Sequence, residues 1–349
     1  MRLIRPLNVA RLLALMLAFS VCAPTSALEA ATRKKSSTST RTAKPTYSAA
    51  ASRARKARLA RARAAARARE QARLAALQEA MRPRFKTDAT GAQVPDIRAA
   101  AAIIFNPETG QVLWEENAQD KRSIASITKV MTALVFLEDN PDLSQEITVE
   151  RGDVYAASTT YLRANERVTL DNILHFTLIA SDNAAARVLA RVSHGGSASF
   201  VERMNEKAVE LGLESTSFTD PSGLNPANVS SAYDLSRLIS FASANDTLAP
   251  IMRTAEYTAR TSRRTITIRN TNHLVRGGEV DVLGGKTGFI SKAGYCLATL
   301  LKLPQSNHQV AVVVLGAGSN NGRFWETRHL FNWLAEKASD VFAKEQESK

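Results

Sequence analysis

Three short groups of polar residues, which occur in a fixed order along the chain, have the residue types needed for nucleophilic catalysis. The tetrad 126–129 (Ser-Ile-Thr-Lys) comes first, the triad 181–183 (Ser-Asp-Asn) begins 55 residues later, and the triad 286–288 (Lys-Thr-Gly) begins after another 105. A serine hydroxyl is a weak nucleophile until a base removes its proton, and a neutral lysine amine can be that base. Taken alone, Ser126 reads as a helix cap and Lys129 as a solvated surface lysine. The indication of catalysis therefore comes from the fixed order of all three groups and not from the first group alone.

An apolar run at helical spacing surrounds the first group. Ser126 is therefore predicted to begin a buried helix, with Lys129 one turn later on the same face. An unperturbed lysine has a pKa of about 10.4, so the site must lower this pKa by burial and by neighbouring positive charge, which Lys286 could supply. The start of a helix would also let the N–H of Ser126 form half of an oxyanion hole. The apolar run consists of Ile127, Val130, Met131, Leu134 and Val135.

The third group is predicted to lie on a strand that returns through a short turn at residues 291–292. Its glycines would remove side chains where a substrate backbone lies against the strand edge. The run Gly-Lys-Thr also suggests a phosphate-binding loop. That interpretation fails because Val280 stands where the first glycine belongs and because no helix is expected to follow.

Together the three groups resemble the penicillin-recognising serine enzymes, the class of the β-lactamases and of the peptidases of bacterial cell-wall synthesis. Residues 124–133 are similar to the active-site helix of the low-molecular-mass penicillin-binding proteins. Residues 269–275 and 293–297 are similar to the D-alanyl-D-alanine endopeptidase branch of that family. The resemblance covers roughly residues 97–335. It implies a two-lobed α+β fold in which helices flank an antiparallel sheet.

The resemblance also implies roles for the first two groups. Ser126 would attack the substrate carbonyl, Lys129 would take the proton of Ser126, and Ser181 would pass a proton to the leaving amine. Asn183 would orient Lys129 and hold the substrate amide, on a loop between helices. Asp182 would point away from the substrate and act structurally, which also agrees with its reading as a helix cap.

In the third group, the resemblance implies that Lys286 and Thr287 hold a substrate carboxylate beside Gly288. The backbone N–H of Phe289 would complete the oxyanion hole. No metal or cofactor is implied, and the five histidines show no metal-ligand spacing.

The function expected from these residues is that of an exported serine D,D-peptidase acting on peptidoglycan stem peptides. The favoured hypothesis is that the enzyme cleaves cross-links between D-alanine and diaminopimelate. D-alanyl-D-alanine carboxypeptidase activity, a class A-like β-lactamase and a catalytically silent wall-binding protein are the alternatives. A class A β-lactamase carries a Glu-x-x-Leu-Asn loop, whereas residues 220–225 read Asp-Pro-Ser-Gly-Leu-Asn. This departure favours slow hydrolysis of β-lactams, which would act as covalent inhibitors.

The first 27 residues have the features of a signal peptide. Three arginines precede an apolar core of ten residues, and the run Thr-Ser-Ala at 25–27 is a small-residue cleavage site. The core is too short to span a bilayer. Export to the periplasm is the expected result. After cleavage only Cys296 remains, and its apolar strand predicts a buried, inert thiol.

The net charge of +13 belongs to the N-terminal part of the chain. Residues 1–86 contain 20 basic and 3 acidic residues, whereas residues 87–349 contain 26 and 30. Residues 28–90 are predicted to be a disordered or transiently helical linker, and residues 91–349 the catalytic domain. In an exported protein, an anionic membrane or wall polymer suits this basic segment better than nucleic acid, and a solvated spacer is the alternative.

Periodicity predicts further elements of the catalytic domain. Two strands form a hairpin around a turn at 106–110, and Ser231 caps a helix that carries Asp234 three residues later. The expected strands cover residues 100–105, 111–114, 265–269 and 309–315, and the expected helices cover 200–211, 232–242 and a closing segment from Trp325 to Leu334.

Overall fold

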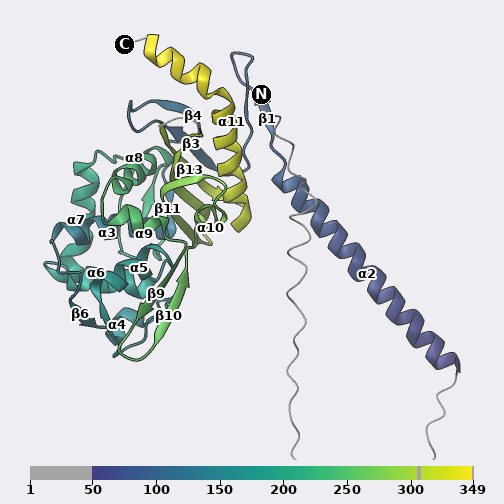
Figure 1. Cartoon of the computed structure of the whole chain (residues 1–349), viewed down its shortest axis with the longest axis horizontal. Coiled ribbons are helices and arrows are strands. Elements are labelled where there is room, and N and C mark those ends of the chain that lie inside the picture. Colours follow the sequence, from purple (N-terminus) through teal and green to yellow (C-terminus); the bar gives the residue numbers. More distant parts are fainter. Residues whose placement is uncertain (1–48, 305–307, 348–349) are drawn as a thin grey trace, which may run out of the picture. The chain divides into compact units, whose positions relative to one another are not determined.

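The computed structural model describes residues 49–304 and 308–347 of the chain (Figure 1). It divides into two compact units, Met1–Arg67 and Ala68–Lys349. All the elements that surround the three groups lie in the second unit. The signal peptide predicted for residues 1–27 lies outside the described residues. Within the described part of the chain, none of the helices combines the length and the apolar character needed to cross a bilayer.

The helix α2 (Ala49–Met81) covers the alanine- and arginine-rich part of the chain. Its side chains are exposed from Ala51 to Glu79. Alanine and arginine are strong helix formers, so the helix forms without an apolar face to bury. Its nine basic residues, against two acidic ones, are spaced so that they surround the helix axis.

An antiparallel sheet of five strands forms the centre of the second unit. Strands β12 and β13 are buried on both faces, which explains why they read as continuous apolar runs. The third group lies on β11, which is the terminal strand of the sheet. The strands, in spatial order, are β11 (Asp281–Ile290), β12 (Gly294–Lys302), β13 (Gln309–Ala317), β3 (Ala101–Phe105) and β4 (Val112–Glu116).

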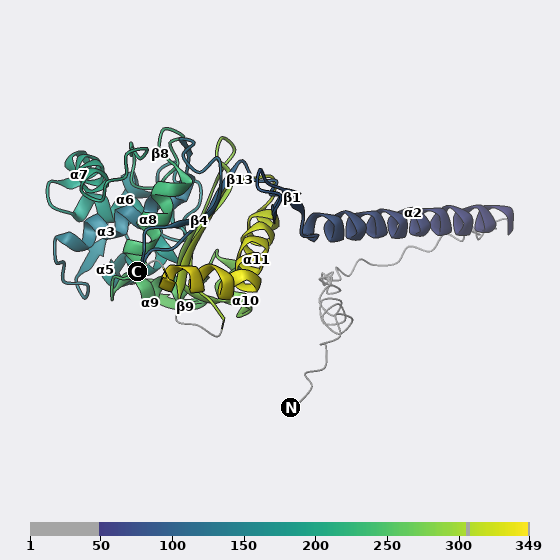
Figure 2. The same cartoon turned by 90° about the horizontal axis from the view of Figure 1, so that it is seen from above.

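Helices cover both faces of this sheet, as Figure 2 shows from above. Helix α11 (Asn320–Glu347) packs on one face, where its Phe324 and Leu330 belong to the same hydrophobic core as the strand residue Leu297. Helix α8 (Ala232–Ser243) packs on the other face. Successive strand residues point to opposite faces, so the neighbouring Ala298 belongs to the core under α8. Ser231 caps α8 as predicted, because its side chain accepts the N–H of Asp234.

A helical lobe continues the core beyond α8, and α3 is its central helix. Nine consecutive residues of α3, from Thr128 to Phe136, are buried, because other helices pack around it. The structure therefore has the two-lobed α+β fold that the resemblance implies. The helices of this lobe are α3 (Thr128–Glu138), α4 (Arg151–Val154), α5 (Leu170–Leu178), α6 (Asn183–Val192), α7 (Gly196–Glu210) and α9 (Leu248–Arg253).

Short elements connect the two lobes and extend the second unit. The hairpin β9–β10 runs from the sheet along the helical lobe toward α4, as the light green arrows in Figure 1 show. Helix α10 (His273–Gly277) follows it and leads into β11. The other short elements are β1 (Phe85–Thr87), β2 (Gln93–Pro95), β5 (Arg122–Ser123), the 3₁₀ turn η1 (Ala125–Ile127), β6 (Glu146–Thr148), β7 (Arg167–Thr169), β8 (Val229–Ser230), β9 (Glu256–Arg260) and β10 (Thr265–Arg269).

Candidate active site

Ser126 lies in the turn η1, immediately before α3 begins at Thr128. The prediction that Ser126 itself begins the α-helix is therefore wrong by two residues. Ala125 has a positive φ of 49°, so the chain enters through a tight turn before the α-helical pattern starts. Lys129 still follows one turn later, and its Nζ lies 2.9 Å from Ser126 Oγ.

Lys129 is fully buried and meets three oxygen atoms. Besides Ser126 Oγ, these are Asn183 Oδ1, at 2.6 Å, and the main-chain oxygen of Ser222. A neutral amine has two hydrogens and one lone pair. If Asn183 and Ser222 accept the two hydrogens, the lone pair faces the hydroxyl of Ser126. The contacts therefore orient Lys129 as a base for this hydroxyl.

The pKa of Lys129 is lowered to about 7, and burial is the main cause. The carboxylates of Asp182 and Asp220 oppose this shift, and the guanidinium of Arg187 adds to it. Lys286, which the sequence suggested as the source of positive charge, is not among these causes. Burial also lowers the pKa of Lys286 itself, to which the charge of Lys129 contributes.

Ser181 and Asp182 lie between α5 and α6, as expected, whereas Asn183 is the first residue of α6 and not part of the loop. Ser181 has a φ of 59°, and Asp182 caps α6 by accepting the N–H of Ala185. The other oxygen of Asp182 accepts the hydroxyl of Thr160 and the N–H of Tyr161. Asp182 is fully buried, and burial raises its pKa. It therefore does not face a substrate but attaches a neighbouring loop to the second group.

The third group meets the second group through Lys286. The Nζ of Lys286 donates to Ser181 Oγ at 2.7 Å and to the main-chain oxygen of Thr287 at 2.9 Å. Thr287 Oγ1 donates to Thr271 Oγ1 at 2.7 Å. The hydrogen of the Thr271 hydroxyl is then free to point into the cleft that both threonines line.

Two glycines pack closely against the backbone of the turn that carries Ser126. A Cβ on Gly223, whose φ is +82°, would lie 2.1 Å from the main-chain oxygen of Ala125, and one on Gly288 would lie 2.5 Å from that of Ile124. Both distances are too short for any side chain. Gly288 is therefore needed because its strand touches the turn of Ser126, whereas the sequence suggested that the glycines leave room for a substrate.

A cleft of about 530 Å³ opens between these elements. Six of the eight predicted site residues line it, and Lys129 and Lys286 lie buried behind it. The structure thus brings together all eight residues. Those lining the cleft are Ser126, Ser181, Asn183, Thr287, Gly288 and Phe289, joined by Ser158, Thr159, Ala180, Leu224, Thr271, Ile290, Ser291 and Arg323.

Three contributors to the site were missed in the sequence. The oxygen of Ser222 is a main-chain group, for which a sequence has no signal. Thr271 lies in the family-like stretch 269–275, but nothing in the sequence indicates its role. Arg323 Nη1 donates to the main-chain oxygens of Gly288 and Cys296, and burial lowers its pKa to about 10. The available signal for Arg323 was its place directly before the apolar residues that begin the closing helix.

Asp220 does not serve as a base in the cleft. Its Oδ1 accepts the N–H and the hydroxyl of Ser222 and the N–H of Gly223, and its Oδ2 accepts Asn225 and Asn228. Although burial acts to raise the pKa of Asp220, these hydrogen bonds hold it below its ordinary value. The loop presents Leu224 to the cleft instead. This arrangement lacks the deacylating carboxylate of the β-lactamase alternative.

Comparison with known proteins agrees with this site. Residues 88–319 match the family model described as D-alanyl-D-alanine carboxypeptidase, peptidase S11. The D-alanyl-D-alanine endopeptidase of Escherichia coli (strain K12) is 34% identical over 250 residues, which cover 70% of this chain and 80% of that protein. The enzyme of the same name from Pseudomonas aeruginosa is 32% identical and covers 68% of this chain and 78% of that protein.

The solved structure of the Streptomyces K15 DD-transpeptidase has a TM-score of 0.65 and 31% identity to this chain, covering 69% of this chain and 98% of that chain. The region that matches the family model contains all three groups. The chain therefore belongs to the D-alanyl-D-alanine carboxypeptidase family and is a serine D,D-peptidase of the low-molecular-mass penicillin-binding class.

Proposed function

We propose that this peptidase cuts peptidoglycan cross-links, at the bond between D-alanine and the side-chain amine of diaminopimelate. The observation that carries the proposal is the paired contact of Lys129 with Ser126 and of Lys286 with Ser181 beside one cleft. The preference for cross-links is supported by the relatives from E. coli and P. aeruginosa, which are named endopeptidases.

In the proposed acylation step, Ser126 Oγ attacks the carbonyl carbon of the D-alanine and its proton passes to Lys129 Nζ. The negative charge that develops on the carbonyl oxygen is held by the backbone N–H groups of Ser126 and Phe289. When the scissile C–N bond breaks, the leaving amine receives a proton from Ser181 Oγ, and the Ser181 oxygen takes a proton in its place from Lys286 Nζ. Lys286 donates to Ser181 Oγ, so it orients this hydroxyl and eases the proton transfer.

The substrate is proposed to lie along the free edge of β11. This strand has a neighbour on one side only, so its other edge can pair with an extended peptide. Asn183 holds the substrate amide, and Lys286, Thr287 and Gly288 bind the carboxylate end. The Asn183 side chain is fixed for this role because its Nδ2 donates to the main-chain oxygen of Ala157 at 2.7 Å.

Water then hydrolyses the acyl-enzyme and releases the shortened peptide. β-Lactam antibiotics would form the same ester on Ser126. Because Asp220 already accepts five hydrogen bonds, it is not available to activate water against that ester. This supports β-lactams as covalent inhibitors rather than as rapidly hydrolysed substrates.

We further propose export to the periplasm by a signal peptide at residues 1–27, with residues 28–90 as a linker to a catalytic domain at 91–349. The basic helix α2 would bind an anionic membrane or wall polymer, and nucleic acid is not an expected partner. Binding to isolated sacculi and to anionic vesicles should then weaken steeply as salt rises. The variant Arg55→Gln/Arg58→Gln/Arg61→Gln should bind less, and unchanged binding would contradict this role for α2.

Digestion of purified muropeptides tests the main proposal. The mature chain is expected to convert cross-linked dimers to monomers faster than it removes D-alanine from pentapeptides, and Ser126→Ala should do neither. If the dimers persist while the pentapeptides become tetrapeptides, the protein is a carboxypeptidase. That result would reject the cross-link preference and leave the serine mechanism in place.

A further inference from the structure

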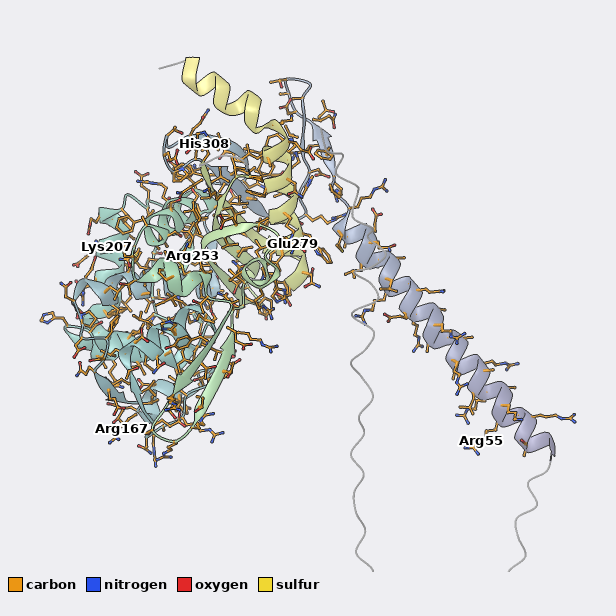
Figure 3. All side chains as sticks on the ribbon, in the orientation of Figure 1. Arg55, Arg167, Lys207, Arg253, Glu279 and His308 are labelled. Atoms are coloured by element: carbon orange, nitrogen blue, oxygen red, sulfur yellow. The ribbon has the colours of Figure 1, made fainter. Side chains whose placement is uncertain are left out.

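Five arginines gather where the turn of the β9–β10 hairpin meets the segment 161–167. The two segments are joined by hydrogen bonds from the N–H of Ser262 to the main-chain oxygen of Arg167, at 2.9 Å, and from the N–H of Arg167 to Ser262 Oγ, at 3.0 Å. Figure 3 shows the labelled Arg167 at the end of the helical lobe that the hairpin reaches. We call this set the hairpin-end cluster, and it consists of Arg163, Arg167, Arg260, Arg263 and Arg264.

Three of these arginines are unpaired. Arg264 bonds to the buried carboxylate of Glu166, and Arg167 lies 3.4 Å from Glu146. Arg163, Arg260 and Arg263 are exposed, and no carboxylate among residues 51–304 and 308–337, whose side chains the structure describes, lies within ion-pair distance of them. Five guanidinium groups thus face two carboxylates, although residues 87–349 as a whole are mildly acidic. The positive charge is therefore a local feature of this surface.

The hairpin-end cluster is connected to the wall of the catalytic cleft. Arg264 Nη2 donates to the main-chain oxygen of Tyr161, whose N–H donates to the buried Asp182 of the second group. Ser158 and Thr159, just before Tyr161 in the chain, line the cleft. A strand of substrate that leaves the cleft past Ser158 and Thr159 would therefore reach the arginines.

Two exposed tyrosines lie in the same segment of chain as the cleft-lining Ser158 and Thr159. Tyr155 is 80% exposed and Tyr161 is 41% exposed, on either side of the cleft-lining residues. The ring of Tyr161 stacks on Phe176, which holds it in place. Exposed aromatic rings beside unpaired arginines suit a ligand that combines apolar ring faces with carboxylates. A glycopeptide strand has both, because its sugars have apolar faces and its peptides carry free carboxylates.

We propose that the hairpin-end cluster binds the carboxylates of a second glycopeptide strand, namely the one that is cross-linked to the strand held in the cleft. This proposal rests on the proposed function, since only a polymeric cross-linked substrate places a second strand there. A small soluble muropeptide would end before it reached the arginines. The cluster would thus favour intact wall polymer over its soluble fragments.

The test compares Arg163→Gln/Arg260→Gln/Arg263→Gln with a control that removes the same charge elsewhere in the catalytic domain, Lys121→Gln/Arg253→Gln/Arg276→Gln. The control residues are also exposed and unpaired within the described part of the chain. Hydrolysis of sacculi should fall about three- to tenfold in the cluster variant at low salt, in keeping with a few exposed charge contacts. Cleavage of soluble dimers and acylation by penicillin should stay within twofold of the wild-type protein, which also shows that the variant folds.

Binding of sacculi by full mature chains that carry Ser126→Ala tests the proposal without activity. The cluster substitutions should weaken this binding and reduce its dependence on salt, whereas the control substitutions should do so less. Equal binding by the two variants, or an equal loss on sacculi and on soluble dimers, would overturn the proposal.

Loss of binding to vesicles of phosphatidylglycerol and phosphatidylethanolamine, with sacculus binding retained, would overturn the proposal in favour of a membrane contact. Failure of the wild-type chain to cut any dimer would reject the proposed function but would leave this binding result interpretable.

Discussion

Lys129 and Ser222 lie 93 residues apart in the chain, and the side-chain nitrogen of Lys129 donates a hydrogen bond to the main-chain oxygen of Ser222. Ser222 belongs to a loop whose backbone is hydrogen-bonded to the side chain of Asp220. At Gly223 the same loop packs closely against the turn that carries Ser126. The orientation of the base and the position of the nucleophile therefore depend on the same loop. Changes in this loop should affect acylation even though its carboxylate does not face the cleft.

The state of Lys129 should appear in the pH dependence of acylation. Only the neutral amine accepts the proton of Ser126, so the rate of acylation by penicillin should rise with pH through a midpoint near 7. Arg187→Gln removes a positive neighbour and should raise the pKa of Lys129, which moves the midpoint upward. Lys286→Met should move the midpoint less, because Arg187 but not Lys286 is among the causes that lower the pKa of Lys129. A larger shift in the Lys286 variant would contradict this order of causes.

Ser126→Ala should abolish the covalent penicillin adduct without unfolding the protein, because it removes one oxygen at the cleft. In the unchanged protein, the adduct is expected to persist for minutes or longer, since Asp220 is not available to activate water. Mass spectrometry of the intact protein after mixing with penicillin measures both results. Rapid turnover with no surviving adduct would favour a β-lactamase.

Asp220→Asn separates the role of loop organiser from that of catalytic base. In the variant, the NH₂ group of the asparagine would face backbone N–H groups that now donate to the carboxylate. These hydrogen bonds would be lost, so the loop should become less ordered. Stability should fall by about 2 kcal/mol, and acylation should slow. If Asp220 were the deacylating base, the variant would instead acylate normally and hold its adduct longer. Thermal unfolding and the two rates measured together distinguish these results.

Thr271→Val should reduce the preference for substrates that carry a carboxylate. The valine keeps the shape of threonine but removes the hydroxyl that bonds to Thr287 and that can donate into the cleft. The ratio of acylation rates for penicillin and its methyl ester should fall about tenfold, as expected for a hydrogen bond to a charged group. Thr271→Ser should retain the ratio. An equal loss for acid and ester would indicate a structural role only.

Gly223→Ala should damage the turn of Ser126. Its Cβ would lie 2.1 Å from the main-chain oxygen of Ala125, in addition to the strain of a positive φ. Stability should fall by about 2 kcal/mol or more, and acylation should be lost. Gly91→Ala is the matched control, because Gly91 has a φ of +86° and no atom within 4 Å of the added Cβ. This control should cost about 1 kcal/mol and leave acylation unchanged.

The elements near the site could be predicted because their signals are local. The apolar spacing after Ser126 indicated a buried helix, and β11 and β12 were read from two strands around a short turn, as the structure confirms. Ser231 and Asp234 indicated the start of α8 for the same reason. The resemblance to a known family placed the three polar groups in one cleft before any distance was known.

The sequence by itself determined the order of the three groups, the elements that carry them and the class of enzyme. Only the tertiary structure decided that the oxygen of Ser222 holds Lys129, that Thr271 bonds to Thr287, and that burial rather than Lys286 lowers the pKa of Lys129. The physical reason is that helices and strands follow from periodic patterns within about 10 to 20 residues. Hydrogen bonds and desolvation depend instead on which distant segments pack together, and main-chain atoms are the same in every residue.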